Sequence, residues 1–227
     1  MSNQIILTGH TKGIGRSLLS LLIQSGNFEV LGISRSSAGI ASISELSCDL
    51  SNPAEVKAIL PHIESSNPGY LILNAGANSI RPAESYSYLE VEKAYYLNLV
   101  SPALLIRACI PALVRNKGHL IVLGSFSALE VRRWNNYYGS AKAGLHHLVK
   151  NIFEQYRKQQ VRVSLIVPDI VASDFYSGQD FQPDTSPEYS ISPDEVARLI
   201  FNIIQEKSGY VPFEVVIRPQ MFKLHRR

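Results

Sequence analysis

The sequence predicts an α/β protein, with a doubly wound parallel sheet of about seven strands and helices on both faces. Short apolar runs of strand length alternate with longer segments of helical period over the 227 residues. The short runs are almost continuously apolar, as strands are when helices cover both faces of a parallel sheet. No linker, repeat or low-complexity tract interrupts the pattern, so residues 1–227 are expected to form one domain.

Seven segments have the apolar, turn-bounded character of buried strands. In chain order they are Ile5–Thr8, Val30–Ser34, Glu45–Cys48, Tyr70–Asn74, Leu120–Gly124, Val161–Val167 and Glu214–Ile217. Ligands of such sheets bind at the carboxyl ends of the strands. The functional residues are therefore expected directly after these segments.

Five segments between the strands have the period of amphipathic helices. They are Ile14–Ser25, Pro53–Ser65, Tyr88–Arg115, Asn136–Lys158 and a helix that begins at Ser192. The last of these starts with a serine cap, a proline in the first turn and two acids. We expect Pro102 and Pro111 to bend the long third helix, because proline interrupts helical hydrogen bonding.

The charge balance does not favour nucleic acid as a partner. The chain has 22 basic and 19 acidic residues, which gives a net charge of +3. The basic residues at the C-terminus, Lys223, His225, Arg226 and Arg227, are interpreted as a solvated end.

The cysteines and the apolar runs indicate in which cellular compartment the protein is expected. Cys48 and Cys109 are too few for a disulfide framework or a metal site, and both are expected to be buried in a reducing compartment. The N-terminus shows no signal peptide, and no apolar run is expected to approach the length of a membrane span. We therefore expect a soluble, cytoplasmic protein without a membrane partner.

A glycine-rich loop follows the first predicted strand and leads directly into the first helix. It reads Thr8-Gly9-His10-Thr11-Lys12-Gly13-Ile14-Gly15. Gly9 suits a tight turn, Gly13 the close approach of a pyrophosphate, and Gly15 close packing of helix on strand. Free N–H groups at the helix N-terminus favour an anion. The loop predicts a dinucleotide site, although ordinary strand–helix turns also carry glycines in this way.

The residues after the second strand favour NADP(H) over NAD(H). Enzymes that use NAD usually have an acidic residue there, which binds the ribose 2′-hydroxyl. This chain reads Gly32-Ile33-Ser34-Arg35-Ser36, without an acid. Arg35 offers a fork of donors to a 2′-phosphate, and Lys12 adds a second cation. Each of the two is, taken alone, also compatible with an ordinary surface cation.

Tyr138 and Lys142 lie four residues apart and share one face of the fourth predicted helix. A free phenol has a pKa near ~10, so it needs a nearby cation to exchange protons at neutral pH. We expect Lys142 and an oxidised nicotinamide ring to lower the pKa of Tyr138. Tyr137 has Ala141 four residues on and lacks such a partner. The spacing alone is also typical of surface pairs, but Ser125, where the fifth strand ends, is suited to hydrogen-bond a carbonyl.

Together these motifs resemble the short-chain dehydrogenase/reductase family over nearly the whole chain. The family's T-G-x-x-x-G-x-G matches Thr8–Gly15, its adenine-contacting aspartate matches Asp49, and its N-A-G matches Asn74-Ala75-Gly76. Its helix asparagine matches Asn98, and its serine-to-tyrosine spacing selects Ser125 rather than Ser127. The resemblance implies a Rossmann-type fold and an NADP(H)-dependent oxidoreductase.

The resemblance also implies a role for each matching residue. Tyr138 would exchange the proton with the carbonyl, Lys142 would assist it and hold the nicotinamide ribose, and Ser125 would orient the carbonyl. Asn98 would anchor a water that relays protons from Lys142. The implied cofactor-binding residues are Gly9, Thr11, Lys12, Gly13, Ile14, Gly15, Ser34, Arg35, Asp49, Leu50, Asn74, Ala75, Gly76, Tyr138, Lys142, Pro168, Val171 and Ser173.

The chain departs from the family after the sixth predicted strand. The usual P-G-x-V-x-T reads Pro168-Asp169-Ile170-Val171-Ala172-Ser173. The carboxylate of Asp169 is expected either to face solvent or to lie at the cleft, where it would favour a cationic substrate or disfavour an anionic one.

Three further groups lie outside the motifs. A substrate loop is predicted at about 172–191, with Phe175, Tyr176, Phe181 and Tyr189, which either close over substrate or pin the loop to the body. Arg132, Arg133 and Trp134 are expected near the substrate entrance. His146 and His147 are interpreted as interface or surface residues, since no metal set accompanies them.

The sequence thus predicts an enzyme that interconverts a ketone or aldehyde and an alcohol by hydride transfer, with Tyr138 as general acid/base. Its partner is a small carbonyl or alcohol substrate, and no metal is expected. The family commonly pairs subunits through two long helices, here 88–115 and 136–158, so a homodimer or homotetramer is expected. The alternatives are a non-catalytic NADP(H)-binding sensor or scaffold, and an epimerase or dehydratase on the same fold.

Overall fold

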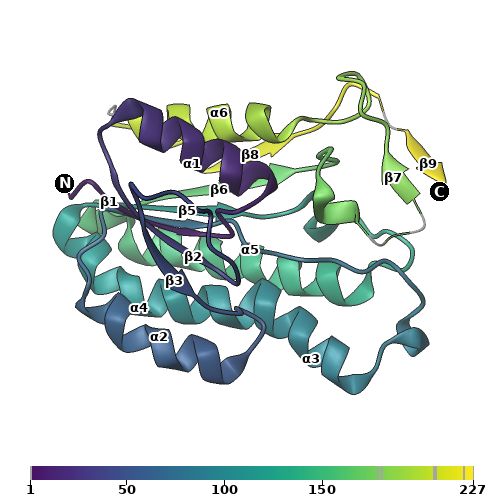
Figure 1. The fold of residues 1–227 in the computed structure, drawn as a ribbon, viewed down its shortest axis with the longest axis horizontal. Coiled ribbons are helices and arrows are strands. Elements are labelled where there is room, and N and C mark those ends of the chain that lie inside the picture. Colours follow the sequence, from purple (N-terminus) through teal and green to yellow (C-terminus); the bar gives the residue numbers. More distant parts are fainter. Residues whose placement is uncertain (1, 178, 180, 207–208, 222, 227) are drawn as a thin grey trace.

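Seven parallel strands form the centre of the fold in the computed structural model, which describes residues 2–177, 179, 181–206, 209–221 and 223–226 (Figure 1). Across the sheet their order is β3-β2-β1-β4-β5-β6-β8. In chain order they are β1 (Gln4–Thr8), β2 (Glu29–Ser34), β3 (Ser44–Ser47), β4 (Tyr70–Leu73), β5 (His119–Leu123), β6 (Arg162–Pro168) and β8 (Glu214–Ile217). The predicted doubly wound parallel sheet is confirmed, and the strand bounds differ from the prediction by about one residue.

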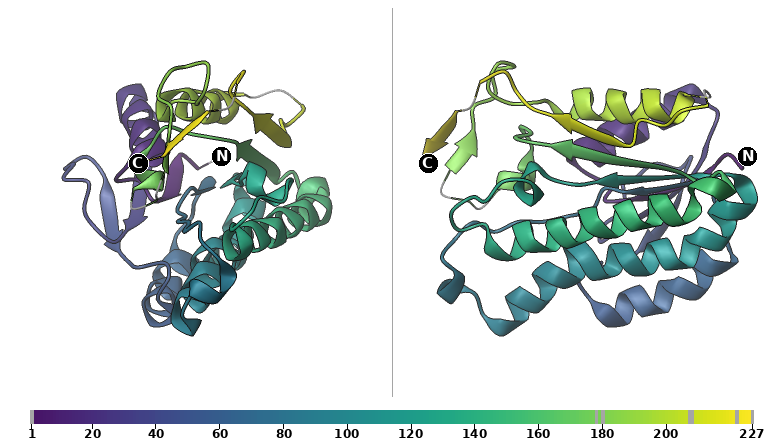
Figure 2. Two further views of the ribbon diagram at one scale, coloured as in Figure 1. Left: turned by 90° about the vertical axis from the view of Figure 1, so that its right-hand side faces the viewer. Right: turned by 180° about the vertical axis from the view of Figure 1, so that it is seen from behind.

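Helices cover both faces of this sheet (Figures 1 and 2). On one face α1 (Gly13–Ser25) lies beside α6 (Pro193–Gln205). The other face carries α2 (Pro53–Ser65), α4 (Ser101–Asn116) and α5 (Asn136–Tyr156). Because β1 leads to a helix on one face and β4 to a helix on the other, a crevice opens between their carboxyl ends, where ligands of such sheets bind.

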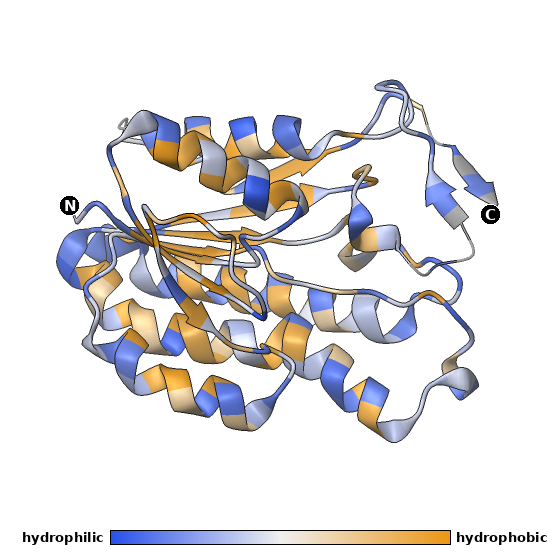
Figure 3. Ribbon diagram, in the orientation of Figure 1, coloured by the Kyte–Doolittle hydropathy of each residue, from blue (hydrophilic) through white to orange (hydrophobic). Residues whose placement is uncertain are grey.

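Two apolar layers hold the helices to the sheet, and the central strands between them are mostly apolar (Figure 3). Leu19 of α1 and Ile200 of α6 are fully buried in one layer, and Leu113 of α4 and Val149 of α5 in the other. Burial of each such side chain contributes roughly 1.5–3 kcal/mol. Both cysteines are buried, as predicted.

The long third helix is irregular directly before Pro102, one of the two prolines that were expected to bend it. α3 (Tyr88–Tyr95) passes into a π-helical segment, η2 (Tyr96–Val100), and then into α4. Pro102 lies in the first turn of α4, directly after η2, and Pro111 lies inside α4. Proline has no N–H to donate to the carbonyl four residues earlier, which for Pro102 is that of Asn98 inside η2, so the irregular turn lies where Pro102 interrupts the helix. Single π-helical turns of this kind are frequent at functional sites.

The stretch Tyr88–Asn116 is long and apolar enough, by length and composition, to cross a membrane. The expectation that no apolar run reaches this length is wrong for it. More than half of its most apolar window is nevertheless buried inside the molecule, where α4 packs on the sheet. Core helices meet the same length and composition criteria.

A second, two-stranded sheet lies beyond the carboxyl ends of the parallel strands (Figures 1 and 2). Its antiparallel strands are β7 (Phe181–Pro183) and β9 (Leu224–Arg226). Asp184 pairs there with His225 at 2.8 Å and with Lys223 at 3.4 Å. The side chains of Lys223 and His225 are 49% and 46% exposed, in agreement with a solvated end. The backbone of residues 224–226 nevertheless forms a strand that pairs with the predicted substrate loop. Arg227 lies outside the described residues.

Candidate active site

A cleft of about 1000 Å³ opens at the carboxyl ends of the parallel strands. Most of the residues predicted to bind cofactor or to catalyse lie on its wall. These are Gly9, Thr11, Lys12, Gly13, Ile14, Ser34, Arg35, Asp49, Leu50, Asn74, Ala75, Gly76, Ser125, Tyr138, Lys142, Pro168, Val171 and Ser173. Gly15 and Asn98 are the two predicted residues that do not line the cleft, and both support residues that do.

The glycine loop and the segment after β4 form one hydrogen-bonded unit. The hydroxyl of Thr8 accepts from the backbone N–H groups of Asn74 and Ala75, both at 3.0 Å. The amide of Asn74 donates to the carbonyl of Gly9 at 2.9 Å. A Cβ atom on Gly15 would lie 2.0 Å from the same carbonyl, so only glycine fits there. The sequence role given to Gly15, close packing of helix on strand, agrees with this geometry.

The N-terminus of α1 is open toward the cleft. Its first residue, Gly13, has φ +50°, and no side chain caps the helix at Lys12. No acidic residue lies in the first turn. Uncapped N–H groups and the helix dipole favour an anion at this point, so the residues present fit the pyrophosphate of a dinucleotide. Ser173 approaches from the other wall, 3.7 Å from a Cβ built on Gly13.

Residues after β2 and β3 line the end of the cleft that suits an adenosine. Arg35 is exposed there, and Asp49 accepts from the backbone N–H of Ser51 at 2.9 Å. Burial would raise the pKa of Asp49, but the hydrogen bonds from Ser51 and the charge of Arg35 hold it below its usual value. Glu45 of β3, which the sequence did not single out, accepts from the hydroxyl of Ser37 and from the N–H of Ala38. It thereby anchors the loop that carries Arg35.

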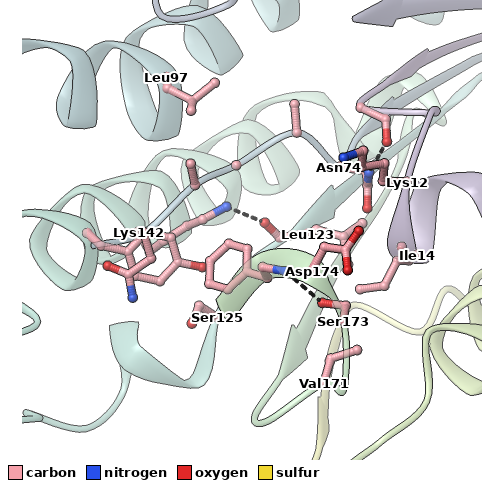
Figure 4. A pocket seen from close by; sticks show the side chains of 18 of the residues that line it. Lys12, Ile14, Asn74, Leu97, Leu123, Ser125, Lys142, Val171, Ser173 and Asp174 are labelled. Carbon is pink, nitrogen blue, oxygen red and sulfur yellow. Dashed lines mark hydrogen bonds between the residues drawn. The ribbon is translucent and has the colours of Figure 1, made fainter. Parts of the chain in front are cut away.

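Tyr138 and Lys142 lie on α5 and line the cleft, and both are buried. Figure 4 shows Lys142 beside Leu123. The ammonium of Lys142 donates to the carbonyl of Leu123 at 2.8 Å and lies 5.8 Å from the centre of the Tyr138 ring. Burial lowers the pKa of Lys142 to about 8. Burial also raises the pKa of Tyr138, and a hydrogen bond with Ser125 opposes this only in part. The expected lowering by Lys142 is not found, because desolvation dominates both groups.

Ser125 and Asn98 flank this pair. Ser125 follows β5 directly, and its hydroxyl accepts from the N–H of Ser127 at 3.2 Å. Asn98 lies in η2 and is fully buried, with its amide donating to the carbonyls of Ala77 and Ala94 at 3.0 and 2.9 Å. A Cβ on Gly76 would lie 3.1 Å from Oδ1 of Asn98 and 3.6 Å from Nζ of Lys142. A side chain at position 76 would therefore crowd both polar groups, and glycine leaves room for them.

His146 is buried against the backbone of Ser125, so its interpretation as an interface or surface residue is wrong. His147 is exposed, as expected. Nε2 of His146 accepts from the backbone N–H of Ser125 at 3.1 Å, in a buried contact. A Cβ on Gly124 would lie 2.2 Å from Nε2, so glycine makes room for the ring. Burial and the charge of Lys142 lower the pKa of His146 to about 4, so the ring is neutral at pH 7. The spacing from Lys142, one helical turn, was a signal that placed it on the catalytic face.

Asp169 does not face solvent, because its side chain is only 4% exposed. Its two carboxylate oxygens accept from Arg132 at 2.9 Å and from Arg218 at 3.0 Å. Two guanidinium groups thus surround one carboxylate, which removes the ground for expecting a cationic substrate. The sequence reasoning missed Arg218, although it follows directly after the last predicted strand, where functional residues were expected.

Aromatic side chains of the predicted substrate loop close one wall. The ring of Phe175, in η5 (Asp174–Tyr176), lies 5.6 Å from that of Tyr138, and Tyr176 is in edge contact with Phe175. Trp134 is 43% exposed and is stacked by Arg133. The loop therefore both packs against Tyr138 and lines the cleft. The side chain of Phe181 lies outside the described residues.

Known proteins are similar in sequence to most of this chain. The family model for short chain dehydrogenases matches residues 3–182. The NADP-dependent 3-hydroxy acid dehydrogenase YdfG of Shigella flexneri is 28% identical over 192 residues, which cover 79% of this chain and 77% of that protein. Carbonyl reductase family member 4 of Danio rerio is 26% identical over 192 residues, covering 78% of this chain and 79% of the relative.

Solved structures show the same fold at lower identity. An alcohol dehydrogenase from the archaeon Thermococcus sibiricus, complexed with 5-hydroxy-NADP, superposes with a TM-score of 0.83 at 19% identity, over 96% of this chain and 97% of that one. A 4-hydroxyisoleucine dehydrogenase complexed with NADH and succinate gives 0.80 at 23%, over 95% and 97%. The family match spans well over half of the chain, and this protein therefore belongs to the short-chain dehydrogenase family.

Proposed function

We propose that this protein is an NADP(H)-dependent oxidoreductase that interconverts a ketone or aldehyde and an alcohol. The observation that carries the proposal is the meeting of Ser125, Tyr138 and Lys142 at the floor of one cleft whose other end is built for a dinucleotide. Relatives named as a carbonyl reductase and as an NADP-dependent 3-hydroxy acid dehydrogenase support the reaction class.

Each residue of the group has a task that its position supports. A bound nicotinamide supplies the hydride. The phenol of Tyr138 donates the proton to the carbonyl oxygen, and the hydroxyl of Ser125, hydrogen-bonded to Tyr138, orients that oxygen. The ammonium of Lys142, held by the carbonyl of Leu123, stabilises the phenolate that remains. Asn98, which like Lys142 lies beside Gly76, anchors a water that relays protons from Lys142 in this proposal.

NADP(H) is the proposed cofactor because no acidic side chain follows β2 and Arg35 stands there instead. Lys12, the N-cap residue directly before α1, adds a second positive charge. Arg35 and Lys12 both line the cleft, and their positive charges suit a cofactor with an added phosphate, whereas an NAD-type acid would repel the 2′-phosphate.

The proposal is tested by following NADPH absorbance with a panel of ketones, aldehydes and quinones. We expect turnover of at least one carbonyl, and Tyr138→Phe should lower kcat by about 10²-fold or more while NADPH still binds, since proton transfer is lost. Tyr137→Phe is the matched control, because the Tyr137 ring packs on Tyr86 away from Lys142. Binding of NADPH without turnover of any carbonyl would favour the sensor or scaffold alternative.

The second alternative, epimerisation or dehydration through a transient ketone, leaves NADPH unconsumed overall. It predicts conversion of an alcohol substrate without net change in absorbance. Net oxidation of NADPH in proportion to alcohol formed excludes it for this chain.

A further inference from the structure

Asn135 stands directly before α5, at the position from which an asparagine usually caps a helix. Its side chain makes no such cap, and the residue is only 7% exposed. Its Oδ1 is buried without a hydrogen-bond partner among the described residues. Asn135 thus forgoes a stabilising cap and leaves a buried acceptor unsatisfied. Both features are unusual in a folded protein, where buried polar atoms are nearly always paired.

The unsatisfied side chain belongs to the wall of the cleft, close to Tyr138. Asn135, Ser125 and Tyr138 all line the cleft. The backbone carbonyl of Asn135 accepts from the N–H of Gly139 at 3.1 Å, so the helical hydrogen bonding begins at Asn135. Three residues rise about 4.5 Å along a helix, which places Asn135 within one turn of Tyr138.

The first turn of α5 is also packed against the segment that carries Ser125. A Cβ atom on Gly139 would lie 3.1 Å from the carbonyl oxygen of Ser127. The N–H of Ser127 donates in turn to the hydroxyl of Ser125 at 3.2 Å. A short series of contacts therefore joins Asn135 to Ser125 as well as to Tyr138. A carbonyl held between Ser125 and Tyr138 has the amide of Asn135 as a neighbour on the same wall.

The backbone that carries Asn135 is held on both sides. The N–H of Asn135 donates to the carbonyl of Arg132 at 3.2 Å, and the carbonyl of Trp134 accepts from the N–H of Arg81 at 3.1 Å. Trp134 itself has φ +64°, a left-handed conformation that side-chain-bearing residues rarely adopt. The amide of Asn135 is thus presented to the cleft by a fixed turn, and a ligand can bind it without ordering a free loop.

The chemistry of the amide limits which group it can bind. The unsatisfied Oδ1 accepts a hydrogen bond, so it needs a donor. A carboxylate offers none at neutral pH. An ammonium would bury a charge beside a neutral partner, which is costly. A hydroxyl donates without charge and is therefore the group that fits.

We propose that Asn135 binds a hydroxyl group next to the reacting carbonyl, so that the substrates are hydroxyketones and the corresponding vicinal diols. This inference rests on the proposed function and names its substrate class. Asn135 then discriminates against a substrate that lacks the hydroxyl, because its buried oxygen stays unpaired in that complex.

The experiment compares 2-hydroxyacetophenone with propiophenone, in which a methyl group replaces the hydroxyl beside the same carbonyl. The ring of both compounds suits the wall at Phe175, which lies 5.6 Å from the Tyr138 ring. With NADPH saturating, we expect the hydroxyketone to have the higher kcat/KM in the wild type. Asn135→Ala should lower the ratio of the two kcat/KM values by about fivefold or more, because the hydrogen bond is lost.

Comparison of variant and wild type cancels the different intrinsic reactivity of the two ketones. Asn135→Leu, which keeps the bulk of the side chain but not its polarity, should lower the ratio in the same way. Asn136→Ala is the matched control, because it makes the same change at the neighbouring, exposed asparagine. It should alter the ratio by no more than about twofold.

Two kinetic results overturn the inference and leave the proposed function standing. One is a wild type that does not prefer the hydroxyketone. The other is a preference that survives in both Asn135 variants.

Isothermal titration of the NADPH complex with 1-phenylethane-1,2-diol and with 1-phenylpropan-1-ol separates the inference from the proposed function. Tighter binding of the diol that depends on Asn135, without turnover of any carbonyl, supports the hydroxyl site while the proposed reaction fails. Equal binding of the two alcohols, binding of neither, or equal binding of the diol by wild type and Asn135→Ala overturns the inference whatever the kinetics.

Discussion

Burial sets the chemistry of Tyr138 and Lys142 at the scale of single residues. Both side chains lie in a low-dielectric floor, where the neutral form of each group is favoured. The pKa of Lys142 falls to about 8, and that of Tyr138 rises. At pH 7 Lys142 therefore remains mostly protonated, and its ammonium, together with a positive cofactor ring nearby, would favour the phenolate of Tyr138.

The lowered pKa of Lys142 predicts how stability changes with pH. The unfolded chain keeps this proton up to about its ordinary value of 10.5, whereas the folded chain releases it near 8. Between these values the unfolded state binds more protons, so the free energy of unfolding should rise with pH. Lys142→Met, which cannot titrate, should lose this rise between pH 8 and 10 in chemical denaturation. Parallel curves of unfolding free energy against pH for wild type and variant would contradict the lowered pKa of Lys142.

His146 carries a second prediction at this scale. His146→Leu leaves the buried N–H of Ser125 without an acceptor, which should cost about 1–3 kcal/mol of unfolding free energy. It should also lower kcat more than it raises KM, because Ser125 loses its position. His146→Gln, which keeps an acceptor, should restore part of kcat, and His147→Leu on the exposed face is the control. Identical kcat in His146→Leu and wild type would show that the contact is only structural.

At the scale of elements, the turns after the strands decide which ligand fits. Glu45 of β3 ties the loop after β2 to its own strand and, through His10 at 2.6 Å, to the glycine loop. The η2 turn places Asn98 behind Gly76 in the same way. Side-chain hydrogen bonds from neighbouring elements thus hold these irregular segments in place.

The loop after β2 predicts the cofactor preference. Arg35→Ala should raise KM for NADPH by about tenfold or more, with little effect on NADH, because the partner of the 2′-phosphate is removed. Glu45→Gln should also raise KM for NADPH relative to KM for NADH, but by less, because it only loosens the loop that carries Arg35. Glu29→Gln, at the opposite end of β2, serves as the control. Equal losses for both cofactors in Arg35→Ala would overturn the assignment to NADP(H).

At the scale of the whole molecule, the long helices leave apolar side chains uncovered. Tyr88 and Leu89 at the start of α3 and Val100 in η2 are exposed, on the stretch that was expected to pair subunits. Exposed apolar groups gathered on one element are typical of interaction surfaces.

We expect light scattering after size exclusion to give two or four times the chain mass of 25.2 kDa. Val100→Glu should shift the protein toward the monomer, because a charge would be buried in the contact. Val131→Glu, at a fully exposed apolar residue of the loop before α5, should leave the mass unchanged. A wild-type protein that elutes as a monomer at all concentrations contradicts the prediction.

Local patterns were enough to predict the strands, the helices of the sheet and most of the cleft wall. Thr8–Gly15, Ser125, Tyr138 and Lys142 were found from the chain because glycine geometry and helical spacing act over a few residues. The role of Asp169 and the burial of His146 could not be predicted from the chain, because both depend on partners from other elements. Asp169 pairs with Arg132 and Arg218, and His146 packs against Gly124 and Ser125.

The sequence by itself determined the α/β fold, the glycine loop and the spacing of Tyr138 and Lys142, because these follow from the order and period of neighbouring residues. Only the tertiary structure decided three other features: the direction of the pKa shift at Tyr138, the pairing of the C-terminal strand with the substrate loop, and the charge that the cleft presents around Asp169. The physical reason is common to them. Desolvation, strand pairing and charge balance each depend on residues that are distant in the chain and meet only when it folds.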